Sequence, residues 1–238
     1  MPRQGRIDAP GALHHIIIRG IESRAIFEDD NDRADFLERL SGLLLETATP
    51  CYAWALMTNH VHLLLRTGTV PIATIMRRLL TGYALRFNKR HGRRGHLFQN
   101  RYKSILCEED AYFTQLVAYI HLNPVRAGIV ADVAALKTYP WTGHGVLMGK
   151  SVRAWQDTAF VLGLFGRTLA EARRNLQRHL SEWSAKGPRP ELTGGGLIRS
   201  VGGWRMVREA YRNGVRLAGD ERILGSSYRS PEAKWRVV

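Results

Sequence analysis

Two histidines, His60 and His62, have the type and spacing that metal chemistry needs. The apolar run Leu63 to Leu65 follows them directly and is typical of a buried strand. Because side chains two apart on a strand point to the same face, both imidazoles would project together while Val61 points into the core. Two adjacent imidazoles supply half of a divalent-metal site. The alternative is one buried, hydrogen-bonded histidine beside a half-exposed one.

Tyr119 and Asn123 are four residues apart and share one face of a predicted helix, whereas His121 points elsewhere. A tyrosine offers a nucleophilic oxygen once its proton is removed. An asparagine amide oxygen is a neutral, hard ligand that could complete a His/His/O set for Mg²⁺ or Mn²⁺. The alternatives are a packed aromatic residue at position 119 and a helix-ending turn residue before Pro124.

A stretch between residues 77 and 103 combines nine cationic side chains with several aromatic ones and contains no acid. Arginine and lysine grip phosphates, and aromatic faces stack unpaired bases, so this composition favours a single-stranded nucleic-acid surface over a merely solvated helix face. The nine candidate DNA-binding residues are Arg77, Arg78, Arg86, Lys89, Arg90, Arg93, Arg94, Arg101 and Lys103.

The composition of the whole chain supports a nucleic-acid partner. A net charge of +14 over 238 residues favours nucleic acid, with anionic membrane as the competing partner. No apolar run approaches the ~18 residues needed to cross a bilayer, and the N-terminus does not resemble a signal peptide. We therefore expect a cytoplasmic protein with no membrane partner. Two cysteines, Cys51 and Cys107, are expected to be reduced core thiols.

The order of predicted elements is strand, helix, strand, strand, helix, strand, helix. The strands are predicted over 14–19, 51–56, 60–65 and 102–107, and the helices over 30–47, 70–87 and 108–124, where Pro124 would end the last one. The first six elements match the split βαβ pattern. We therefore predict an α+β fold with a ferredoxin-like four-stranded antiparallel sheet. Helices over 155–165, 169–183 and 201–212 would follow it.

The sequence resembles the single-tyrosine HUH transposases, specifically the REP-associated tyrosine transposases. The resemblance extends over about residues 7–145 and is carried by the segments 14–20, 57–62, 95–104 and 119–128, in the expected order. The predicted elements are α/β before residue 150 and small and helical after it, which places a boundary there. With the resemblance, this implies a catalytic domain over residues 1–150 and a helical accessory region over 151–238. The residues after Gly225 depart from the family pattern, so we expect this accessory region to be truncated.

The resemblance also implies a mechanism. His60 and His62 would bind a divalent metal, and Asn123 would complete that site. Tyr119 would attack a DNA phosphate and leave a 5′-phosphotyrosine and a free 3′-hydroxyl. The substrate would be single-stranded or hairpin DNA, and the protein a monomer or a homodimer. A metal-dependent nicking and strand-transfer enzyme is therefore the favoured hypothesis.

Two other functions compete with that hypothesis. A domesticated DNA- or RNA-binding regulator with weak catalysis would carry the same basic surface, so charge does not separate it from the enzyme. A His-x-His metallohydrolase of small substrates would have an enclosed pocket and an activity indifferent to salt.

Overall fold

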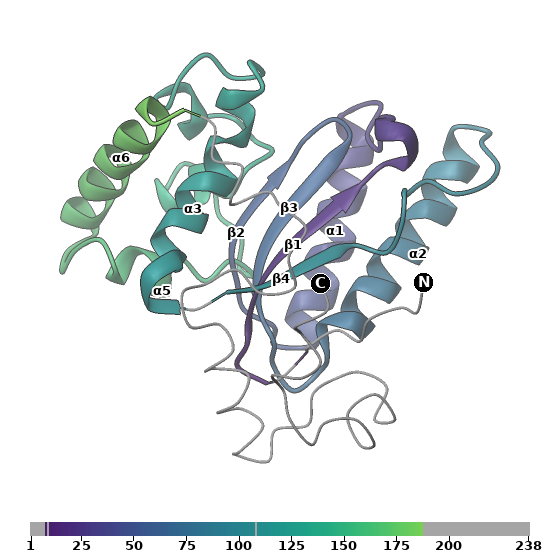
Figure 1. The fold of residues 1–238 in the computed structure, drawn as a ribbon, viewed down its shortest axis with the longest axis horizontal. Coiled ribbons are helices and arrows are strands. Elements are labelled where there is room, and N and C mark those ends of the chain that lie inside the picture. Colours follow the sequence, from purple (N-terminus) through teal and green to yellow (C-terminus); the bar gives the residue numbers. More distant parts are fainter. Residues whose placement is uncertain (1–7, 9, 108, 188–238) are drawn as a thin grey trace, which may run out of the picture.

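The computed structural model describes residue 8 and residues 10–107 and 109–187, with side chains omitted for 109–112. Its centre is a four-stranded sheet in which β1 (Leu13–Arg19), β2 (Cys51–Leu56), β3 (His60–Arg66) and β4 (Lys103–Cys107) lie in the order β2-β3-β1-β4 (Figure 1). Every neighbouring pair is antiparallel. This is the predicted ferredoxin-like sheet of an α+β fold.

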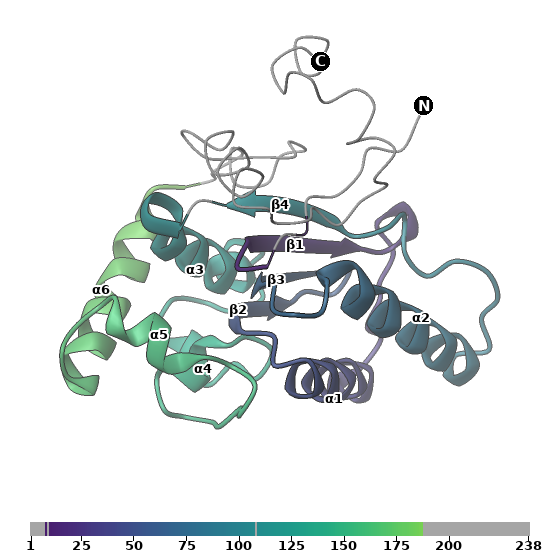
Figure 2. The ribbon, with the colours of Figure 1, turned by 90° about the horizontal axis from the view of Figure 1, so that it is seen from below.

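Two long helices, α1 (Asp30–Glu46) and α2 (Ile72–Arg90), cover one face of the sheet (Figure 2). Alternation along the strands builds this layer, since Val61, Leu63 and Leu65 of β3 all point into the same apolar cluster as the two helices. His62 and Leu64 therefore face the other way. Figure 2 shows that α3 (Glu109–Arg126) lies on that second face.

The shorter elements complete the second layer around α3. They are α4 (His144–Leu147), α5 (Thr158–Gly163) and α6 (Leu169–Ala185), with short 3-10 turns at Ile21–Ser23 and Ala135–Lys137. Apolar residues of α5 and α6 share one cluster with α3 and the sheet. The segment just before α5 also contacts β2, because Oε1 of Gln156 accepts a hydrogen bond of 2.9 Å from Nε1 of Trp54.

The predicted division into two domains at residue 150 remains a prediction. Apolar residues of α5 and α6, which follow this boundary, pack in the same core as residues that precede it. The predicted helix over 201–212 and the segment after Gly225 in which a truncation was expected lie outside the described residues. No described helix has both the length and the apolar character required to span a membrane. Cys51 and Cys107 are buried and free, as expected.

The prediction that Pro124 ends α3 is wrong, because the helix continues to Arg126. Proline has no N–H, so the carbonyl of Ile120 lacks its usual helical donor. The side-chain Nδ2 of Asn123 replaces that donor, bonding the carbonyl oxygens of Tyr119 at 2.9 Å and Ile120 at 3.3 Å. The chain leaves the helix at Gly128, whose φ of +67° is a conformation that glycine adopts without strain.

Candidate active site

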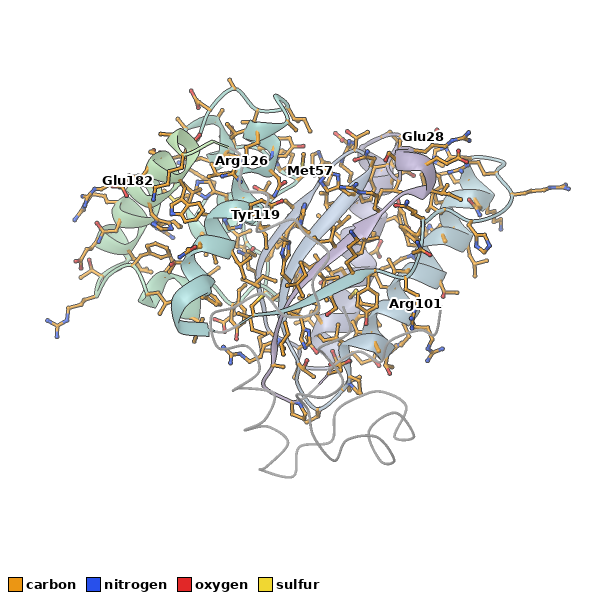
Figure 3. All side chains as sticks on the ribbon, viewed as in Figure 1. Glu28, Met57, Arg101, Tyr119, Arg126 and Glu182 are labelled. Carbon is orange, nitrogen blue, oxygen red and sulfur yellow. The ribbon has the colours of Figure 1, made fainter. Side chains whose placement is uncertain are left out.

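One pocket brings together all four residues predicted to form the catalytic and metal site. Its walls include His60, His62, Tyr119 and Asn123, and it holds about 380 Å³. The other lining residues are Ile17, Arg19, Gln99, Asn100, Arg101 and Lys103. The histidines come from β3, and the tyrosine and asparagine come from α3, so a single chain supplies both parts. Figure 3 labels Tyr119 on α3.

The two histidines project together from β3, as their spacing predicts. Their ring centroids are 5.0 Å apart, with the rings nearly perpendicular. Nδ1 of His60 is 2.7 Å from Oδ1 of Asn59, and Nδ1 of His62 is 2.9 Å from Nε2 of His15. The Nε2 atoms of His60 and His62 take no part in these two bonds.

Burial keeps both imidazoles neutral. It lowers the pKa of His60 to about 4, with a smaller contribution from the Arg19 guanidinium. It lowers the pKa of His62 well below the usual value, and the neighbouring His15, His60 and Arg19 act in the same direction. A neutral imidazole keeps the lone pair that a metal ligand needs.

Tyr119 reaches the histidines from α3 and is 4% exposed. Its ring meets that of His62 edge-on, with 5.6 Å between the centroids. Burial raises the pKa of the Tyr119 hydroxyl, while the Arg126 and Arg19 guanidinium groups oppose that rise. The Arg126 Cζ lies 5.3 Å from the ring centroid. The cationic neighbours therefore favour the tyrosinate, and burial favours the neutral phenol.

The orientation of the Asn123 amide follows from its bonds within α3. Its NH₂ group donates to two helix carbonyls, so Oδ1 is the atom left to interact with the pocket. Among the described residues, His, Cys, Asp and Glu side chains form no cluster of three that could hold a metal. Two neutral imidazoles and one amide oxygen are nevertheless a suitable donor set for a divalent cation, with substrate or water in the remaining positions.

Arg19 lines the pocket and was not among the predicted site residues. It pairs with His60 across the β1–β3 register, so its side chain shares the face of the histidines. The next residue is Gly20, where a Cβ would lie 2.2 Å from the carbonyl oxygen of Arg24. Glycine is therefore needed for the turn that follows Arg19.

Gln99 and Asn100 also line the pocket without having been predicted. The backbone N–H of Gln99 donates to the carbonyl of Arg19 at 3.0 Å, and Phe98 forms an isolated bridge with Gly20. These contacts hold the segment against the end of β1. The segments 14–20 and 95–104 carry part of the family resemblance, which is the one sequence feature that could have drawn attention to these residues.

The nine predicted DNA-binding cations divide into two groups. Arg101 and Lys103 line the pocket, and the other seven lie on α2 or in the loop after it. Three cations of α2 form ion pairs with acids of α1 or its N-cap. These pairs are Arg78 with Glu46, Arg86 with Asp35, and Arg90 with Asp29 and Asp32. The stretch without acids in sequence is thus partly neutralised by acids that the fold brings to it.

A family model described as "Transposase IS200 like" matches residues 10–123, from just before β1 to Asn123. Among solved structures, a REP-associated tyrosine transposase bound to a REP hairpin is similar with a TM-score of 0.51 and 16% identity, covering 66% of this chain and 93% of that chain. The tRNA(His) guanylyltransferase of Saccharomyces cerevisiae gives a TM-score of 0.38 at 10% identity, over 82% of this chain and 87% of that chain. No curated protein matches the sequence.

Proposed function

We propose that the protein is a transposase of the IS200-like family, whose model matches residues 10–123, and that it nicks and rejoins single-stranded DNA through Tyr119. The observation that carries the proposal is the pocket in which Tyr119 meets His60, His62 and Asn123. The solved REP-associated transposase is bound to a REP hairpin, so hairpin DNA is the substrate we propose here.

The proposed reaction is a transesterification. Tyr119 Oη gives up its proton to solvent and attacks the phosphorus, the bond to the 3′ oxygen breaks, and the departing 3′ oxygen takes up a proton to become the free 3′-hydroxyl. The 5′ end stays on the enzyme as a phosphotyrosine ester. Rejoining reverses these steps with a 3′-hydroxyl as the nucleophile. Because the phosphotyrosine ester replaces the broken phosphodiester bond, nicking and rejoining together need no external energy source.

Residues of the chain would position the phosphate and balance its charge. Arg19, Arg101 and Lys103 line the pocket and would bind the phosphodiester backbone on either side of the cleaved bond. Burial raises the pKa of Tyr119, and the charges of Arg126 and Arg19 oppose that rise, so these two arginines would stabilise the tyrosinate during attack.

His60, His62 and Asn123 would hold a divalent cation, Mg²⁺ or Mn²⁺. Such an ion, when bound, offsets negative charge on the non-bridging phosphate oxygens. The neutral state of the two imidazoles and the orientation of the Asn123 amide support this assignment.

The test is an adduct assay with hairpin-containing single-stranded DNA and Mn²⁺, followed by a denaturing gel. We expect wild-type protein to form a covalent protein–DNA adduct, and Tyr119→Phe to form none. Tyr139→Phe is the matched control, because Tyr139 is a half-buried tyrosine that does not line the pocket. It should form the adduct at the wild-type level.

Two results would contradict this function. An adduct that persists in Tyr119→Phe would exclude that residue as the nucleophile. Wild-type protein that binds the hairpin without forming an adduct would contradict nicking and favour a DNA-binding regulator with the same fold.

A further inference from the structure

His15 is a buried polar residue in an apolar part of the sheet. It lies on β1 opposite Leu64 of β3 and Ile105 of β4, and both of these neighbours belong to the apolar cluster under α3. The His15 side chain is wholly buried. A polar ring in such a place destabilises the fold unless it is hydrogen-bonded, so packing alone does not account for a histidine here.

The ring of His15 contacts both His62, a candidate metal ligand, and Tyr119, the candidate nucleophile. It stacks on the ring of His62 with centroids 5.1 Å apart, and its edge meets Tyr119 at 5.8 Å. Its Nε2 is 2.9 Å from Nδ1 of His62. One proton must lie between these two nitrogens, and its position decides which nitrogen of His62 has a free lone pair.

A second residue makes the same contact with the other histidine. Oδ1 of Asn59 is 2.7 Å from Nδ1 of His60. The Asn59 amide is fixed in this orientation because its Nδ2 donates to the carbonyl of Ser23 at 3.0 Å. A carbonyl oxygen is an acceptor, so His60 must donate from Nδ1, which leaves the lone pair on Nε2.

We propose that Asn59 and His15 are positioning residues that hold a proton on Nδ1 of His60 and of His62, so that both rings offer Nε2 to the divalent cation. This inference rests on the proposed function. For His62, donation to His15 is the arrangement compatible with a ligand. The reverse arrangement would place a proton on Nε2 of His62 and block it. Metal-binding histidines in general donate their second N–H to such an acceptor.

The test measures the Mn²⁺ affinity of DNA-free protein, by electron paramagnetic resonance of unbound Mn²⁺. His15→Leu and Asn59→Ala remove the two acceptors and should weaken Mn²⁺ binding about 10–100-fold. His15→Gln keeps an acceptor near the position of Nε2 and should recover most of that loss. Thermal unfolding in EDTA establishes that each variant is folded. Asn59 is only half-buried, so Asn59→Ala should fold and test the inference even if His15→Leu does not fold.

His14→Leu is the matched control for loss of a buried histidine from β1. His14 is bonded to Ser104 through Nδ1 and does not line the pocket. We expect its Mn²⁺ affinity to equal that of the wild type. Equal weakening in His14→Leu and His15→Leu, or wild-type affinity in both His15→Leu and Asn59→Ala, would overturn the inference.

Nitrogen-15 spectra of the Mg²⁺-saturated protein give a direct reading of the proton positions. Protons on Nδ1 of His60 and His62 are expected, and a proton on Nε2 of either ring would overturn the inference. Wild-type protein that binds no Mn²⁺ would overturn both this inference and the metal in the proposed function. Normal Mn²⁺ binding without a DNA adduct would contradict the proposed nicking alone.

Discussion

Asn123 is both a hydrogen-bond donor within α3 and a lining residue of the pocket, and substitutions can separate the two roles. Asn123→Ala removes the Nδ2 group that bonds the Ile120 carbonyl. Pro124 cannot replace this donor, because it lacks an N–H. We therefore expect Asn123→Ala to destabilise the metal-free protein.

The size of the effect follows from the burial of Ile120, which is 0% exposed. A buried carbonyl left without a partner costs about 1–3 kcal/mol. For a domain of this size, about 2 kcal/mol corresponds to a fall in Tm of roughly 4–8 °C. Asn123→Asp should lose a similar amount of stability, because a carboxylate cannot donate a hydrogen bond to the carbonyl. It keeps an oxygen for Mn²⁺, however, so it should bind that ion at least as well as wild type.

The assay is a double-mutant cycle in EDTA, with unfolding followed by circular dichroism. Pro124→Ala returns an N–H to the helix, so Asn123→Ala should cost little in that background. The cycle should give an interaction energy of about 1 kcal/mol or more between positions 123 and 124. Additivity within about 0.5 kcal/mol would refute the assignment of Asn123 as the replacement donor for Pro124.

Three further predictions concern other parts of the molecule. Burial lowers the pKa of His144 to about 4, so the native state takes up fewer protons than the unfolded chain below pH 6.5. His144 alone should contribute about 3 kcal/mol to the fall in the free energy of unfolding as the pH drops to 4, and urea titrations of His144→Gln should show a loss that is smaller by about this amount. Gly143→Ala would place a Cβ 2.7 Å from Oε1 of Gln156 and 2.8 Å from Nε1 of Trp54. Thermal melts should therefore show a loss of stability of about 1–3 kcal/mol. An unchanged Tm would show that the two side chains can move aside. Arg101→Gln should reduce the salt dependence of hairpin binding by about 0.7 in the log–log slope, as measured by fluorescence anisotropy. Arg78→Gln, whose side chain is paired with Glu46 away from the pocket, should leave that slope unchanged.

Much of the fold could be predicted from the sequence because local patterns determine it. Continuous apolar and β-branched runs identified the strands, and apolar residues with helical spacing identified α1, α2 and α3 within a few residues. The end of α3 could not be predicted in this way. There, the side chain of Asn123 replaces a backbone donor, whereas the rule for proline considers the backbone alone.

The site was predicted in part for the same reason. Residues that share one element, such as His60 with His62 or Tyr119 with Asn123, have a relative orientation set by local geometry. Arg19 joins the histidines through the register between two strands, which the sequence of either strand alone does not determine. The assignment of catalytic and metal-binding roles to the pocket residues stays a prediction until the adduct and Mn²⁺ experiments test it.

The strands β1, β3 and β4, the segment just before β4 and the helix α3, which together form the pocket, belong to one polypeptide. No encounter between chains is needed to complete the pocket, so the fraction of complete sites does not change on dilution. The initial rate of adduct formation should therefore be first order in protein. Chains carrying Tyr119→Phe and chains carrying His62→Ala should fail to complement each other when they are mixed.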